Sequence, residues 1–140
     1  MIHRLFIRKA DRQRISELFT WFSTRSKKDR KALGLNGCGS KVSGWAVPEL
    51  AFSEACNLHD LLYLMGGTER DRRIADAVFL DLMLARLRFH PRRGRLKKLW
   101  LRLAAHAYFW AVRFFGGASF RYGTRKTIGE MSGMIYRERR

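Results

Sequence analysis

Cysteine and proline are scarce in this chain of 140 residues, with two of each. Two cysteines allow at most one disulfide bond, and their number alone does not indicate the redox compartment. The low proline content, together with the lack of repeats and low-complexity runs, favours one mainly helical domain with tails. Because 46% of the residues are hydrophobic, a domain of this length has enough apolar side chains for a core. We therefore expect a single all-α domain over residues 1–140.

Acidic residues are also few, because 12 Asp and Glu stand against 29 Lys and Arg. The formal net charge is +17. The basic residues are spread over the N-terminal segment, residues 91–98 and the C-terminal tail. An excess of this size predicts attraction to an anionic surface, either the phosphates of nucleic acid or anionic lipid headgroups. Charge alone does not choose between these two partners.

The strongest local pattern in the chain is a helical hairpin over residues 48–88. A first helix is predicted over residues 48–65, and the glycine pair at residues 66–67 ends it. Thr68 is suited to cap a second helix over residues 69–88, and Asp71 completes a pair that resembles a capping box. A turn this short favours an antiparallel arrangement of the two helices.

The hairpin is expected to place His59 opposite Asp76, because His59 lies about eight residues before the turn and Asp76 about nine after it. Asp76 shares a helical stripe with Phe79, Leu80 and Met83, so its carboxylate points toward the core, where it needs a partner. One interpretation of the pair is a structural core histidine. The other is a histidine base whose tautomer the carboxylate fixes.

A glycine-containing loop over residues 31–47 adds a second chemical element. Cys56 lies four residues before Asp60, on the same helical face, and Cys38 lies in the loop. A Cys38–Cys56 disulfide would hold the loop beside the carboxylate of Asp60. Loop carbonyls and one carboxylate are hard oxygen ligands, which suit calcium. A metal site made of both cysteines and His59 is disfavoured, because no fourth ligand is apparent.

These motifs together resemble the phospholipase A2 family. Residues 56–63, Cys-Asn-Leu-His-Asp-Leu-Leu-Tyr, are similar to its Cys-x-x-His-Asp-x-x-Tyr helix, and Gly-Cys-Gly at residues 37–39 is similar to its calcium loop. Residues 73–76, followed by Phe79, resemble the second helix of the short bacterial, viral and phage-associated members. The resemblance extends over about a third of the chain, and it implies an antiparallel helix pair that carries an active site.

The resemblance also implies a role for each matching side chain of the helix pair. His59 would be the general base that takes a proton from water, and Asp76 would orient and stabilise it. Tyr63 would donate a hydrogen bond to Asp76, although plain helix packing explains a tyrosine at this position equally well. The same resemblance implies a disulfide between Cys38 and Cys56.

The implied metal is Ca²⁺, bound by the carboxylate of Asp60 and the backbone carbonyls of Gly37 and Gly39. The N–H of Gly39 would help to hold the developing oxyanion. The loop departs from the family pattern at residues 40–41, where Ser-Lys stands in place of a further glycine. Lys41 is only a candidate for the third carbonyl ligand.

The remaining segments are expected to surround the hairpin. Residues 1–30 form an N-terminal helical segment without an ordinary signal peptide. Either it binds a lipid interface through Trp21 and its phenylalanines, or it packs on the core. Residues 96–115 are expected to form a third helix. Arg102, His106 and Arg113 interrupt its apolar stretch, which favours a packed helix over a membrane span. Residues 118–140 form a basic tail, of which one tyrosine is expected to support Asp76.

Two functions follow from these expectations. The first is calcium-dependent hydrolysis of the sn-2 ester of glycerophospholipids at an anionic membrane surface, by an exported or virion-associated protein. The alternative is a non-enzymatic basic helical module that binds anionic membrane or nucleic acid, with a structural His–Asp pair. Nucleic acid is the less favoured partner, although the charge does not exclude it.

Overall fold

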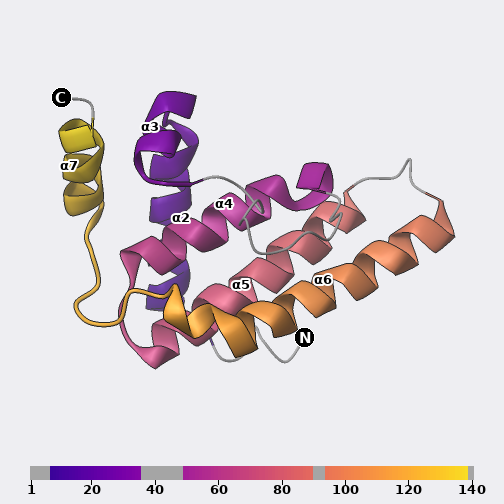
Figure 1. The fold of residues 1–140 in the computed structure, drawn as a ribbon. Helices are drawn as coiled ribbons and strands as arrows, with labels where there is room; N and C mark the ends of the chain where they lie inside the picture. Colours follow the sequence, from indigo (N-terminus) through magenta and orange to yellow (C-terminus); the bar gives the residue numbers. More distant parts are fainter. Residues whose placement is uncertain (1–6, 36–48, 90–93, 139–140) are drawn as a thin grey trace.

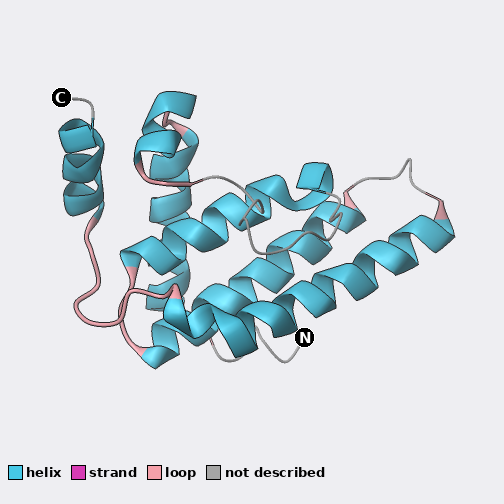
Figure 2. Ribbon diagram, viewed as in Figure 1, coloured by secondary structure: helices cyan, strands magenta, loops and turns pink. Residues whose placement is uncertain are grey.

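The computed structural model describes residues 7–35, 49–89 and 94–138, and the side chains of residues 49–51 are not described. These residues form only helices, turns and loops, with no strand among them, so the all-α expectation is confirmed (Figure 2). The elements in chain order are α2 (Lys9–Ser23), α3 (Lys27–Ala32), α4 (Glu49–Met65), α5 (Glu69–Arg88), α6 (Arg95–Phe115), the 3-10 helix η1 (Gly116–Ala118) and α7 (Ile128–Glu138).

The long helices α4, α5 and α6 lie side by side, and α2, α3 and α7 lie at one end of them (Figure 1). The bounds of α5 agree with the prediction at both ends, and those of α4 agree at its C-terminal end, since residue 48 lies outside the described residues. The N-cap of α5 is Thr68, whose hydroxyl accepts from the N–H of Asp71, while the Asp71 carboxylate accepts from the N–H of Thr68. The predicted capping box is therefore confirmed.

Two buried apolar clusters hold these helices together. The first joins α2, α4, the start of α5 and α7, and it includes Leu18, Leu61 and Met131. The second fills the space between α4, α5 and α6, and it includes Met83 and Leu101. Because α4 and α5 contribute to both clusters, the hairpin is the element on which the rest of the chain packs.

The N-terminal segment consists of two helices rather than one. Helix α2 ends at Ser23, and a capping box between Ser26 and Asp29 begins α3. Leu18 and Phe22 of α2 are buried in the core, so the expectation of a packed segment is confirmed, and the expectation that its phenylalanines contact lipid is wrong for Phe22. The predicted loop over residues 31–47 also begins later than expected, because α3 extends to Ala32. Residues 36–48 lie outside the described residues.

Ion pairs fasten α2 and the segment before α7 to the first turn of α5. Arg70 donates to Asp11 at 2.8 Å, and Arg14 donates to Asp71 at 3.3 Å. Arg125 donates to the same oxygen of Asp71. These arginines therefore pair with acidic side chains of the fold, although from the sequence alone they would be counted as surface charge.

The C-terminal segment, which the sequence predicts as a basic tail, packs on the rest of the fold and ends in a helix. Its residues 120–126 run along the turn between α4 and α5, and α7 follows them and contacts α3. The N–H of Gly67 donates to the Arg121 carbonyl at 3.0 Å, and the N–H of Lys126 donates to the Met65 carbonyl at 2.8 Å. Gly66 and Gly67 have positive φ angles of 73° and 129°, which glycine adopts without a steric cost.

Helix α6 packs on α5 through Leu101, Ala105 and Phe109, which are buried. None of the helices described here combines the length and the apolar character that crossing a membrane requires. The expectation of a packed third helix is therefore confirmed, and its observed start, Arg95, precedes the predicted start by one residue.

We expect Gly66→Ala to lower the free energy of unfolding by about 2 kcal/mol. The added Cβ would meet the Arg121 carbonyl at a residue whose φ is +73°. Gly133→Ala in α7 is the matched control, because no atom outside its own helix backbone and neighbours lies within 4 Å of its Cβ position. The control should raise the free energy of unfolding by about 0.5 kcal/mol, since alanine favours helix. Urea unfolding followed by circular dichroism would measure both, and equal effects would contradict the proposed contact.

Candidate active site

The structure brings His59 and Asp76 together between α4 and α5. Nε2 of His59 lies 3.0 Å from Oδ1 of Asp76, and the hydroxyl of Tyr63 donates to the same oxygen at 2.7 Å. Asp76 is 0% exposed and His59 is 5% exposed. The predicted His59–Asp76 contact and the Tyr63 hydrogen bond are thus confirmed as geometry.

Arg113 of α6 donates a further hydrogen bond to the Asp76 carboxylate. This role was not predicted from the sequence. Nη1 of Arg113 donates to Oδ2 of Asp76 at 2.8 Å. The expectation that a C-terminal tyrosine supports Asp76 is wrong for the described residues, because Tyr122 donates to Glu69 instead and Tyr136 is exposed. The sequence did contain an indication of the role of Arg113, because a charge within an apolar helix that packs on a core needs a buried partner.

A second layer of charges holds Arg113 in place. Glu69 lies 3.5 Å from Nη2 of Arg113, and it accepts two hydrogen bonds from Arg72 at 2.9 and 3.0 Å. Arg72 also donates to the backbone carbonyl of Arg113 at 3.2 Å. The hydrogen bonds from Arg72 and then from Tyr122 lower the pKa of Glu69 to about 2. The N-terminus of α5 and the C-terminus of α6 are thereby joined beside the His–Asp pair.

The electrostatic balance at Asp76 favours the carboxylate. Burial opposes the charge, but hydrogen bonds from His59, Tyr63 and Arg113 outweigh it and hold the pKa of Asp76 below its ordinary value. Burial, followed by the hydrogen bond to Asp76, raises the pKa of Tyr63, so its hydroxyl remains a donor. An ionised Asp76 can only accept hydrogen bonds, and it therefore favours the His59 tautomer that carries its proton on Nε2.

The other ring nitrogen of His59, Nδ1, is then the unprotonated one, and no hydrogen bond joins it to a described residue. The ring is held between two aromatic neighbours. Its centroid lies 4.5 Å from that of Phe79, in a stacked geometry, and 4.1 Å from that of Tyr63. A fixed, buried imidazole with one free basic nitrogen is an arrangement that can remove a proton from water.

Asp60, the predicted calcium ligand, is a half-buried carboxylate that makes no hydrogen bond or ion pair to any described residue. Burial raises its pKa to about 6, an effect that His59 partly offsets. Among the described residues, no three His, Cys, Asp or Glu side chains gather as a metal site would require. The other proposed loop positions, Gly37, Gly39 and Lys41, lie outside those residues.

Cys56 packs in the cluster between α4, α5 and α6, and it is disulfide-bonded. Its predicted partner, Cys38, is the only other cysteine of the sequence and lies outside the described residues. Cys56 precedes His59 by less than one helical turn, so a disulfide here restrains the helix immediately before the His–Asp pair.

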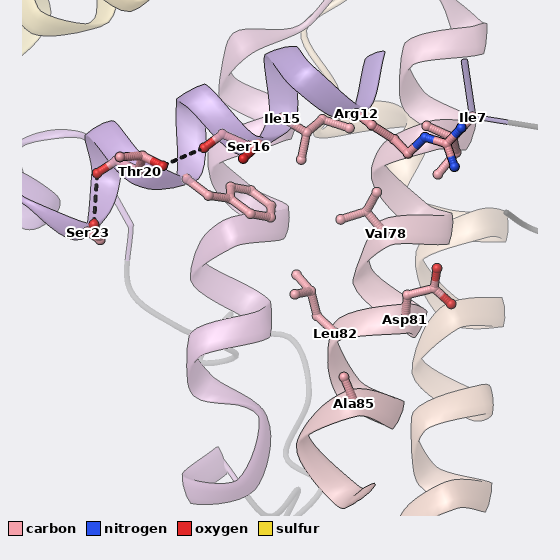
Figure 3. A pocket seen from close by; sticks show the side chains of 11 residues that line it. Ile7, Arg12, Ile15, Ser16, Thr20, Ser23, Val78, Asp81, Leu82 and Ala85 are labelled. Carbon is pink, nitrogen blue, oxygen red and sulfur yellow. Dashed lines mark hydrogen bonds between the residues drawn. The ribbon is translucent and has the colours of Figure 1, made fainter. Parts of the chain in front are cut away.

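A hollow of about 780 Å³ lies between α2 and α5, away from this pair (Figure 3). It is lined on the α5 side by Val78, Asp81, Leu82 and Ala85. These positions lie on the opposite face of α5 from Asp76, and neither His59 nor Asp76 lines the hollow. It is therefore not the path by which a substrate would reach His59.

The chain matches no protein-family model, no curated protein and no solved structure. We therefore infer the function from the geometry of His59, Asp76 and their neighbours, and from the sequence motifs.

We expect Arg113→Met to lower the free energy of unfolding by about 2–4 kcal/mol, because it leaves one side of the buried Asp76 carboxylate uncompensated. Arg102→Met is the matched control on the same helix, where the side chain is exposed, and it should change the stability by less than about 0.5 kcal/mol. The double variant Arg113→Met with Asp76→Asn should lose less stability than the sum of the losses in the two single variants. Additive losses in urea unfolding would contradict a direct ion pair.

Asp60→Asn should stabilise the metal-free protein at pH 7.5 by about 1–3 kcal/mol, measured in a chelator. The pKa of Asp60 is raised on folding, so the folded state binds the proton more tightly than the unfolded chain does. The native protein therefore loses stability at this group as the pH rises from about 4 to about 6. The advantage of the variant should vanish by pH 4, and an advantage that grows toward acid would contradict the assignment.

Proposed function

We propose that this protein is a calcium-dependent esterase of the phospholipase A2 type. Its reaction is hydrolysis of the sn-2 ester of glycerophospholipids, which releases a fatty acid and a lysophospholipid. The observation that carries the proposal is the buried His59–Asp76 pair with its Tyr63 hydrogen bond, which leaves Nδ1 of His59 as the free base. The resemblance of residues 56–63 and 37–39 to that family agrees with this geometry.

In the proposed mechanism, Nδ1 of His59 accepts a proton from a water molecule while the water oxygen attacks the ester carbonyl. The imidazolium that forms keeps its Nε2–H directed at the ionised carboxylate of Asp76, which stabilises the positive charge. Tyr63 and Arg113 hold that carboxylate in place and keep it ionised. When the tetrahedral intermediate collapses, His59 returns the proton to the leaving alkoxide of the lysophospholipid.

The chemistry of Asp60 suits a calcium ligand. A half-buried carboxylate whose pKa burial raises to about 6, and which makes no hydrogen bond or ion pair to a described residue, is an expensive group without a bound cation. We propose that Asp60 and the carbonyls of Gly37 and Gly39 would bind Ca²⁺, and that the N–H of Gly39 would help to hold the developing oxyanion. Calcium, when bound, would polarise the ester carbonyl.

The second candidate is a basic binding module without catalysis, in which the His59–Asp76 pair only stabilises the hairpin. It explains the net charge of +17 as well as an enzyme at an anionic membrane does. This alternative gives no reason for an Asp60 carboxylate that makes no hydrogen bond or ion pair to a described residue. It also gives no role to the unprotonated Nδ1 of His59. The enzyme accounts for both groups.

The test is fatty-acid release from vesicles of phospholipids that carry different acyl chains at sn-1 and sn-2, with calcium and with a chelator. His59→Gln and Asp76→Asn should each lower the rate about 100- to 10,000-fold. Asp81→Asn is the matched control, because this carboxylate is exposed on the opposite face of α5, and it should leave the rate unchanged. Release from sn-1, release in the chelator, or an unchanged rate in His59→Gln would refute the proposal.

A further inference from the structure

Helix α6 is apolar on two opposite faces. Its inward face, with Leu101, Ala105 and Phe109, packs on α5. A second apolar stripe recurs at helical spacing on the outward side, where Leu103 is 62% exposed and Phe114 is 73% exposed. The exposed members of this outward stripe are Leu96, Leu99, Trp100, Leu103, Trp110 and Phe114.

The outward stripe extends over most of the length of α6. Residues 96–114 span about 27 Å along the helix axis, and α6 lies along one edge of the molecule in Figure 1. Trp110 and Phe114 stack with their ring centroids 5.6 Å apart. A contiguous exposed apolar surface of this kind on a folded domain marks an interaction site rather than scattered surface residues.

The charges beside the stripe are all of one sign. Helix α6 contains no acidic residue, and Arg95, Lys97 and Arg102 are basic and exposed over its N-terminal half. A second copy of the chain would bring these like charges together, and each copy carries a net charge of +17. The partner must therefore offer both negative charge and a large apolar region.

A bilayer that contains anionic lipids meets both requirements. Lysine and arginine side chains attract lipid phosphates, while tryptophan and phenylalanine enter the boundary between headgroups and acyl chains. Nucleic acid would pair with the cations but would leave Leu96, Leu103 and Phe114 without an apolar partner. An amphipathic helix that is not a membrane span lies in the plane of the interface.

We propose that the outward stripe of α6 is a docking surface for an anionic lipid bilayer, with the helix axis parallel to the membrane. Docking does not depend on hydrolysis and holds whether or not His59 is a base. The surface belongs to the same helix that supplies Arg113 to Asp76, and Arg113 lies within one turn of Trp110 and Phe114. Arg113 thus connects this end of the surface to the Asp76 carboxylate through a single side chain.

The test uses vesicles of ether-linked phosphatidylglycerol and phosphatidylcholine in a chelator, because ether lipids have no ester to hydrolyse. The full-length protein should cosediment with vesicles that contain phosphatidylglycerol, and its tryptophan emission should shift to shorter wavelength. The double substitution Leu103→Glu and Phe114→Glu should weaken binding at least tenfold. Tyr136→Glu is the matched control, because Tyr136 is 71% exposed on α7, and it should bind as the native chain does.

The proposal would be overturned if the double variant bound vesicles as the native chain does. It would also be overturned if light scattering showed that the double variant lost a dimer and kept vesicle binding. Binding to duplex DNA that the same double variant abolishes would assign the stripe to nucleic acid and would also overturn it. Failure of catalysis is a separate result. A protein that binds these vesicles but releases no fatty acid from ester lipids would retain the docking surface and refute the esterase.

Discussion

The ionised carboxylate of Asp76 is the group on which the rest of the structure depends. It is 0% exposed, and a charge in that position must be compensated within the protein. The compensation comes from His59 and Tyr63 on α4 and from Arg113 on α6, so a single carboxylate on α5 determines how its two neighbouring helices are placed. A buried carboxylate that is satisfied by donors from two neighbouring helices also favours a single arrangement of the three helices.

The basic excess of the chain has two uses. Part of it lies inside the fold, where Arg14, Arg70 and Arg125 pair with Asp11 or Asp71 and fasten α2 and the C-terminal segment to α5. The rest lies on the surface, where it would attract the anionic bilayer proposed above. Arg14, Arg70 and Arg125 therefore serve the fold, whereas basic side chains such as Lys97 and Arg102 of α6 are exposed.

Helix α6 links the two proposed properties of the molecule. Its inward face contributes Leu101 and Phe109 to the core and Arg113 to the Asp76 carboxylate. Its outward face leaves large side chains such as Trp110 and Phe114 in solvent, which costs free energy unless a partner covers them. If this outward face docks on a bilayer as proposed, α6 would connect the membrane to the carboxylate that holds His59.

The sequence by itself determined the features that short-range rules govern. The capping box at Thr68, the end of α4 at Met65, the bounds of α5 and the meeting of His59 with Asp76 all follow from helical periodicity and a short turn. Only the tertiary structure decided that Arg113 binds Asp76, that residues 120–126 run along the turn and that α6 buries one apolar face and exposes the other. These features depend on how segments far apart in the chain pack, and no local pattern encodes that packing.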